Sequence, residues 1–160
     1  MDYKQKYIKY KTKYLEQEGG RRKSKKKLHK NIPINNNSAN MNSIKPNYAD
    51  NVSEPWFSLI LLGLKTVEGR KNKGRFKEMK VGDIVEWTND NFMQRSILIR
   101  ITGKAEYSTF REYLETEGLD KCLPGMEKFG IDQGLSVYFK YYTKEDEKEF
   151  GVVAIRMELK

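Results

Sequence analysis

Cysteine and histidine are almost absent from this chain of 160 residues, and their scarcity removes whole classes of function. Cys122 is the single cysteine and therefore has no partner for an intramolecular disulfide. His29, the single histidine, lies far from it in a basic segment, so the sequence offers no Cys/His zinc cluster. We expect no bound metal and no cofactor, and a thiol nucleophile without a histidine beside it is disfavoured.

Long apolar runs are missing as well. The run Leu59–Leu62 is far shorter than the roughly 20 residues that cross a bilayer as a helix. No secretory apolar segment follows Met1, because lysines recur every two or three residues there. These absences predict a soluble, intracellular protein.

Acidic residues are scarce in the first 50 residues, and this divides the chain in two. Residues 1–50 contain 13 Lys/Arg against 4 Asp/Glu, a net charge of +9. The whole chain has 31 Lys/Arg and 22 Asp/Glu, so residues 51–160 contain 18 basic and 18 acidic residues and have no net charge. We therefore predict a basic appendage on a neutral domain, with the domain at residues 52–160.

The appendage has two predicted parts. Residues 1–18 carry tyrosines at 3, 7, 10 and 14, a spacing that places them on one helical stripe. This leader is either a marginal helix that orders against a partner or a contact for membrane surfaces or nucleic acid. Residues 19–51 are predicted to be a basic and Asn-rich disordered linker. Its basic cluster is a solvated spacer, a nuclear-localisation-like motif or a non-specific phosphate-binding tail, made of Arg21, Arg22, Lys23, Lys25, Lys26, Lys27 and Lys30.

The domain opens with a predicted helix-to-strand elbow. Ser53 is a suitable N-cap and Pro55 suits the first turn, while apolar residues from Phe57 to Leu64 follow helical spacing. Gly63 is placed to end this helix. From Thr66 the period becomes two, as in a strand.

Further along the chain, strands are predicted at Ile84–Trp87, Ser96–Thr102 and Gly151–Leu159, and helices at Phe110–Glu117 and Gln133–Tyr142. Residues 72–79 are predicted to form a basic loop, and residues 145–149 an acidic solvated stretch. No regular strand–helix alternation and no Gly-rich phosphate loop occur, which disfavours a doubly wound α/β fold. The pattern predicts an α+β fold, a small mixed β-barrel with flanking helices.

The elbow also concentrates polar side chains that could contact a ligand. Lys65 could donate to a phosphate or base carbonyl, act as a base if desolvated, or simply be exposed near a helix C-terminus. Glu68 and Arg70 are either a surface ion pair or a pair that recognises an exocyclic amine and a phosphate. Trp87, just before Asn89, could stack on a base or belong to the core.

Five ordered blocks from about Val52 to the C-terminus resemble the ASCH (activating signal cointegrator homology) domain. They are PWFSLILLGLKTVEGR, VGDIVEWTND, the strand that ends at Tyr107, TFREYLETEGLDKCLPGM and FGVVAIRMEL. The family motif G-x-K-T-x-E-x-R corresponds to Gly63, Lys65, Thr66, Glu68 and Arg70. The resemblance implies a PUA-like β-barrel with a cleft beside the elbow, in a family associated with RNA binding and processing.

Some bacterial proteins of this family remove an acyl group from N4-acetylcytidine, and others are ribonucleases. In the amidohydrolases a lysine, a threonine three residues later and a distal glutamate do the chemistry. Lys65 matches that lysine, but Glu68 occupies the threonine position, while Glu115 and Glu117 are candidates for the distal glutamate. Lys65 and Glu68 are thus the candidate catalytic pair.

Three functional hypotheses remain open from the sequence. The first is a module that binds RNA or a modified nucleotide through Gly63, Lys65, Thr66, Glu68, Arg70, Trp87 and Asn89. The second is a hydrolase of the ASCH type, and the third is a virion or scaffold protein with a nucleic-acid-packing tail. In the third, the basic tail packs against nucleic acid and the domain is vestigial. Residues 1–16 also resemble the Tyr/Lys-rich leaders of giant-virus proteins of the mimivirus type. That resemblance implies host cytoplasm or virion as the location, and the basic cluster adds the nucleus.

Overall fold

The computed structural model describes residues 44–93 and 95–160. The described residues include the compact unit Pro46–Lys160. The predictions for the tyrosine leader and for the basic cluster lie outside the described residues.

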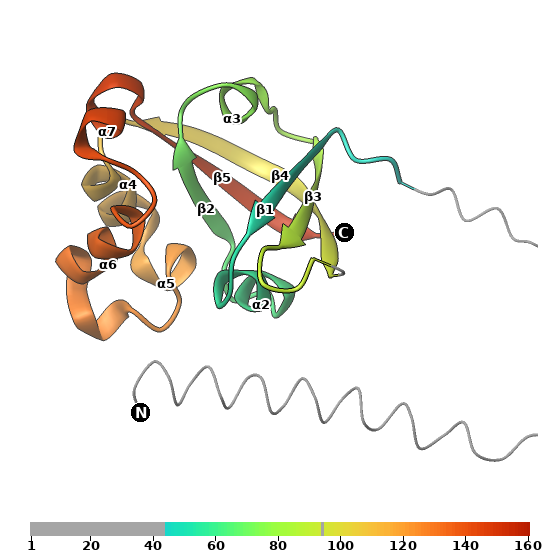
Figure 1. Cartoon of the computed structure of the whole chain (residues 1–160), viewed down its shortest axis with the longest axis horizontal. Coiled ribbons are helices and arrows are strands. Elements are labelled where there is room, and N and C mark those ends of the chain that lie inside the picture. Colours follow the sequence, from blue (N-terminus) through green and yellow to red (C-terminus); the bar gives the residue numbers. More distant parts are fainter. Residues whose placement is uncertain (1–43, 94) are drawn as a thin grey trace, which may run out of the picture. The chain divides into compact units, whose positions relative to one another are not determined.

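A five-stranded sheet forms the centre of the described domain. Its strands are β1 (Tyr48–Val52), β2 (Val67–Lys71), β3 (Ile84–Asn89), β4 (Ser96–Tyr107) and β5 (Val152–Leu159). Their order across the sheet is β1-β3-β4-β5-β2. Only β1 and β3 run parallel among these neighbours, and the other pairs are antiparallel. The sheet curls into a half-barrel, so that its two edge strands, β1 and β2, face each other (Figure 1).

Helices close the ends and one side of this half-barrel. Figure 1 shows α2 at one end of the sheet and α3 at the other, with α4 to α7 gathered beside β2. The bounds of these elements are α2 (Trp56–Leu61), α3 (Arg75–Glu78), α4 (Phe110–Glu117), α5 (Leu119–Cys122), the 3-10 helix η2 (Glu127–Phe129), α6 (Gly130–Tyr138) and α7 (Lys144–Phe150). The predicted α+β fold with a mixed barrel and flanking helices is therefore confirmed.

The core lies inside the curled sheet. Phe57 and Ile60 of α2 pack there against buried residues of β3, β4 and β5, with Trp87 completely enclosed. Burying a side chain of this size stabilises the fold by about 1.5–3 kcal/mol. This core gives the elbow between α2 and β2 a rigid base.

The elbow follows the predicted order but differs at its start. Ser53 does not cap α2; the helix begins at Trp56 after a cis Glu54–Pro55 bond, and Pro55 occupies the cap position without a side-chain hydrogen bond. The Ser53 hydroxyl instead faces Tyr141. Gly63 ends the turn with φ of +68°, a backbone conformation that suits glycine.

Four other boundaries differ from the predictions. Part of the expected linker forms the edge strand β1, because residues 48–52 pair with β3 over their whole length. The expected basic loop contains α3, and the predicted helix at 133–142 lies earlier, at Gly130–Tyr138. The expected acidic stretch is the helix α7, which Thr143 and Asp146 start with a reciprocal capping box.

The helix α4 follows its prediction closely. Thr109 accepts a hydrogen bond from the backbone N–H of Glu112 at the helix start, and Gly118 ends the helix with φ of +90°. Its buried residues are Phe110, Tyr113, Leu114 and Glu117, a spacing that faces one side. This buried face packs toward β2 and α6, and it forms the wall behind the elbow.

Candidate functional site

A pocket of about 140 Å³ opens where the elbow, β1 and the α6–α7 segment meet. Its polar floor consists of Lys65, Glu68 and Arg70. Its aromatic wall consists of Trp56, Tyr138, Tyr141 and Tyr142. This pocket lies beside the elbow, and we consider these seven residues together as one candidate site.

Lys65 lies at the bottom of this pocket, with 2% of its surface exposed. Its ammonium donates to the backbone carbonyl of Val67 at 2.8 Å and to that of Cys122, and it lies 2.9 Å from a carboxylate oxygen of Glu68. An ammonium has three N–H donors, so all of them are used within the protein. Lys65 therefore has no free donor to offer a ligand.

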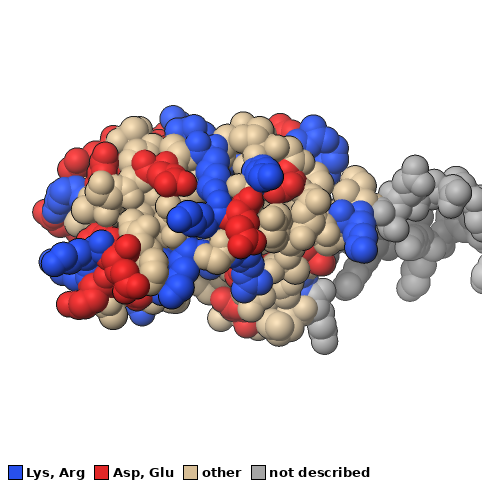
Figure 2. Space-filling model, turned by 90° about the horizontal axis from the view of Figure 1, so that it is seen from above, with Lys and Arg blue, Asp and Glu red and all other residues tan. Residues whose placement is uncertain are grey.

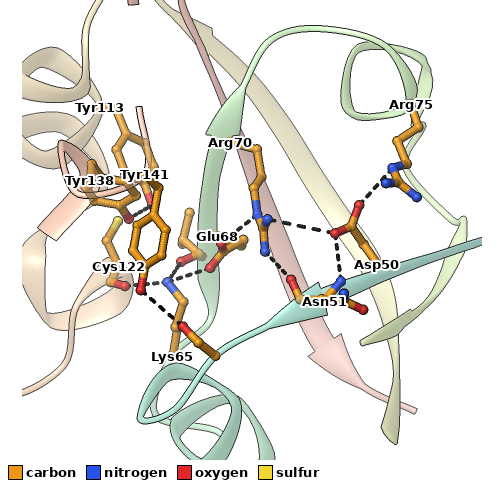
Figure 3. Close-up of polar contacts among 12 residues, drawn as sticks. Asp50, Asn51, Lys65, Glu68, Arg70, Arg75, Tyr113, Cys122, Tyr138 and Tyr141 are labelled. Atoms are coloured by element: carbon orange, nitrogen blue, oxygen red, sulfur yellow. Dashed lines mark hydrogen bonds and ion pairs between the residues drawn. The ribbon is translucent and has the colours of Figure 1, made fainter. Parts of the chain in front are cut away.

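Glu68 is held between two cations (Figure 3). Lys65 contacts Oε2 at 2.9 Å, and Nε of Arg70 contacts Oε1 at 2.8 Å. Burial alone would raise the pKa of Glu68, but the charges and hydrogen bonds of Lys65 and Arg70 outweigh it and hold the pKa below its ordinary value. The carboxylate is consequently ionised at neutral pH and acts only as an acceptor.

Arg70 connects the two edges of the half-barrel. From β2 its Nη2 donates to the backbone carbonyl of Asn51 in β1 at 2.7 Å, and its Nη1 lies 3.9 Å from the Asp50 carboxylate. The guanidinium also lies 5.0 Å from the ring centroid of Trp87 and 5.2 Å from that of Phe76. Arg70 thereby bridges the seam between edge strands that share no backbone ladder.

The aromatic wall differs in rigidity from one residue to the next. Tyr138 stacks on Phe110 with 4.6 Å between ring centroids, and its hydroxyl lies 3.2 Å from that of Tyr113. Burial raises the pKa of both tyrosines well above the usual value, so both remain neutral phenols. Tyr141 is 63% exposed, and its hydroxyl lies 3.3 Å from the Ser53 hydroxyl across the pocket mouth. The wall thus combines a fixed inner ring with an accessible outer one.

Gly69, which the sequence motif leaves as an unspecified position, allows the wall to approach the floor. A Cβ atom at this position would lie 2.7 Å from ring atoms of Tyr113. Gly69 also lines the pocket, between Glu68 and Arg70 on β2. A glycine inside a strand commonly marks such a close approach, and that signal is present in the sequence although the predicted site omits Gly69.

Four of the predicted ligand residues do not line the pocket. Trp87 is 0% exposed, so the prediction that it stacks on a base is wrong; the ring belongs to the core. Asn89 is buried and organises the following turn, accepting from the backbone N–H groups of Asn91 and Phe92 and donating to Glu54. Gly63 and Thr66 are absent from the pocket lining. Thr66 holds the elbow through its backbone, which pairs with Lys121 and Met157.

Neither candidate for the distal glutamate lines the pocket. Glu117 is buried, accepts from the Tyr107 hydroxyl at 2.7 Å and binds Arg156 through both carboxylate oxygens. Glu115 is exposed and pairs with Arg111 at 3.5 Å. Cys122 is buried, and burial raises the pKa of its thiol to about 11, so the thiol is protonated at neutral pH.

The described residues contain neither a cluster of metal-ligating side chains nor a membrane-spanning helix. Within residues 44–93 and 95–160, no group of three or more His, Cys, Asp or Glu side chains is placed to hold a metal ion. No helix in the same part of the chain is long and apolar enough to cross a membrane. The pocket itself presents a fixed anion, its two cations and four aromatic rings.

Comparison with known proteins places this architecture in a family. Two solved structures resemble the chain: the hypothetical protein PH0355, and the protein PF0455 from Pyrococcus furiosus. PH0355 is 34% identical with a TM-score of 0.63, covering 71% of this chain and 98% of its own. PF0455 is 33% identical with a TM-score of 0.54, covering 70% and 94%. No curated protein matches the sequence significantly. The profile of the ASCH domain matches residues 51–160, and the chain therefore belongs to the ASCH domain family.

Proposed function

We propose that the domain binds RNA or a modified nucleotide, with one base held in the pocket at the helix-strand elbow. The observation that carries this proposal is the combination of an ionised carboxylate floor with aromatic walls in one small pocket. Aromatic rings stack on any base, and a fixed acceptor selects among base edges. Membership of a family commonly associated with RNA supports the proposal.

The size of the pocket agrees with a single base. A cavity of about 150 Å³ is known to accommodate a benzene ring, and this one measures about 140 Å³. Tyr141 is exposed at the pocket mouth, so the sugar and the rest of a strand would lie outside the pocket. The pocket is therefore suited to a base or nucleoside, with longer RNA lying across the domain surface.

Hydrolysis, the enzyme hypothesis, receives less support from the geometry. Lys65 has no free donor, and the threonine of the amidohydrolases is replaced by Glu68. Glu115 and Glu117 are engaged elsewhere and do not line the pocket. Because an acid–base mechanism needs a group that can accept or release a proton at the substrate, binding is the better-supported function.

Tyr141→Ala tests this proposal. Loss of one stacking ring is expected to weaken binding of a short single-stranded RNA about five- to 150-fold, because a stacked base contributes about 1–3 kcal/mol. Fluorescence anisotropy at several salt concentrations measures the change. Phe129→Ala is the matched control, since Phe129 is also an exposed ring, at 46%, but lies outside the pocket lining. Equal binding by both variants would contradict a base in the pocket.

A further inference from the structure

The carboxylate of Glu68 has two acceptor positions left for a ligand. A carboxylate has about four lone-pair sites, two on each oxygen. Lys65 occupies one site on Oε2, and Arg70 occupies one on Oε1. Glu68 lines the pocket with 10% of its side chain exposed, and one acceptor site on each oxygen has no partner among the described residues.

The floor offers carboxylate acceptors beside a lysine whose donors are all used. All three N–H donors of Lys65 are used internally, whereas Arg70 pairs with Glu68 through Nε, donates from Nη2 to the Asn51 carbonyl and keeps further N–H groups. The second carboxylate at the pocket, Asp90, is an acceptor as well. A ligand edge with N–H donors would form charge-assisted hydrogen bonds with these carboxylates.

Guanine presents the donor pattern that fits this floor. Its Watson–Crick edge has two adjacent donors, the ring N1–H and the exocyclic N2 amine, and two parallel N–H groups match the two oxygens of one carboxylate. Adenine and cytosine each offer one amine beside a ring acceptor. Uracil offers a single N–H between two carbonyls, both of which would face the carboxylate.

We propose that the pocket selects guanine, in a nucleoside or at an unpaired position of RNA, by a paired hydrogen bond from N1–H and N2–H to Glu68. Tyr138 and Tyr141 would enclose the base, with Lys65 and Arg70 holding the carboxylate in place. This selection rests on the proposed function, because it presumes that a base enters the pocket.

The experiment changes the ligand and leaves the protein unaltered. Isothermal titration of the full chain with guanosine, inosine, 1-methylguanosine and uridine compares edges that differ by single donors. None of these nucleosides carries a phosphate, so the basic cluster in residues 21–30 has no charge to attract. We expect inosine, which lacks the N2 amine, to bind about tenfold more weakly than guanosine. 1-Methylguanosine and uridine should bind still more weakly.

Each outcome separates the two proposals. Equal affinity for guanosine and uridine would overturn guanine selection and leave base binding intact. Absence of binding by every nucleoside and by short RNA would overturn both. Binding of an arginine amide in place of guanosine would also overturn the selection, because a guanidinium has the same paired donors and would identify a peptide ligand.

A protein variant adds a second test. Glu68→Gln keeps the shape of the side chain but replaces one acceptor with a donor, so it should remove the preference for guanosine over inosine. Glu115→Gln is the matched control, because it makes the same chemical change at an exposed carboxylate outside the pocket lining and should preserve the preference. A guanosine preference that survives in a folded Glu68→Gln protein would overturn the assignment to Glu68.

Discussion

Lys65 and Glu68 form a buried pair in which each charge depends on the other. Their side chains are 2% and 10% exposed, and no other anion contacts Lys65 in the described structure. Removing one partner of such a pair leaves an uncompensated charge and typically costs about 3–5 kcal/mol. The residues most closely associated with the pocket therefore also stabilise the fold, and experiments on them need a stability measurement alongside binding.

The acidity of Glu68 predicts a stability change at low pH. The folded-state pKa lies below its ordinary value, so the pair stabilises the protein fully above the unfolded-state pKa and loses this contribution as the pH falls through the folded value. We expect Glu68→Gln to lower the free energy of unfolding by about 3–5 kcal/mol at pH 7 and by much less at the lowest pH where both proteins fold. Urea denaturation of the two proteins between pH 3 and 7 measures the difference in free energy of unfolding at each pH. A constant difference across this range would contradict the role of the charge.

Gly69→Ala tests the close approach of the aromatic wall to β2. The added methyl would lie 2.7 Å from the Tyr113 ring, which is fully buried and packs within the helical layer. Overpacking of this kind costs about 1–3 kcal/mol, and it should also weaken ligand binding because the wall moves. Gly63→Ala is the comparison: its φ of +68° makes alanine strained by about 1–2 kcal/mol, but no atom lies within 4 Å. We expect Gly63→Ala to lose stability and to keep its ligand affinity. An unaltered pocket in Gly69→Ala would show that the wall adapts.

At the scale of elements, the seam between β1 and β2 decides how the half-barrel is closed. These strands are the two edges of the sheet, and side chains rather than a backbone ladder join them. Edge strands with free backbone groups tend to open or pair with other chains. Arg70 occupies one such carbonyl in β1, while Arg75 of α3 donates to another, at Ala49, and contacts Asp50 at 2.8 Å.

Arg70→Lys should open this seam. A lysine cannot reach Glu68 and the Asn51 carbonyl together as the forked guanidinium does, and each charge-assisted hydrogen bond contributes about 1.5–3 kcal/mol. We expect faster hydrogen exchange at backbone amides of Tyr48–Val52, measured by mass spectrometry. Arg75→Lys provides the control, because its side chain is 55% exposed and its contacts should contribute little. Equal hydrogen-exchange rates at Tyr48–Val52 in the two variants would mean that Arg70 does not close the seam.

How much of these elements the sequence predicts depends on where the stabilising contacts lie. The helix α4 is predicted well because its cap, apolar stripe and final glycine are all local. The strand β1 falls within the predicted linker, since its pairing partner β3 lies more than thirty residues away and its own composition is polar. α7 has no buried residue and thus no apolar stripe, yet its capping box is readable. The common face of Glu68 and Arg70 follows from strand alternation. The approach of Lys65, which precedes β2, and the burial of Trp87 and Asn89 depend on tertiary packing.

At the scale of the whole molecule, positive and negative charges are distributed unevenly along the chain. Residues 63–80 carry seven Lys/Arg against two Glu, and residues 106–160 carry eight against twelve acidic residues. Figure 2 shows Lys and Arg side chains in a band across one face of the domain, with Asp and Glu gathered on either side. Such a band attracts a polyanion without specifying its sequence, while the pocket can read a base.

The charge of residues 1–50 predicts the salt dependence of RNA binding. Removing residues 1–45 removes all 13 Lys/Arg of that segment and leaves the compact unit Pro46–Lys160. If the seven basic residues between Arg21 and Lys30 each neutralise one phosphate of a single strand, they contribute about −5 to the slope of log K against log salt. Anisotropy titrations from low to physiological salt should therefore give a much flatter slope for residues 46–160 than for the full chain. The nucleoside affinity of the two proteins should remain equal, because nucleosides bring no phosphate. An unchanged slope would mean that the band on the domain, and not the basic cluster, supplies the phosphate contacts.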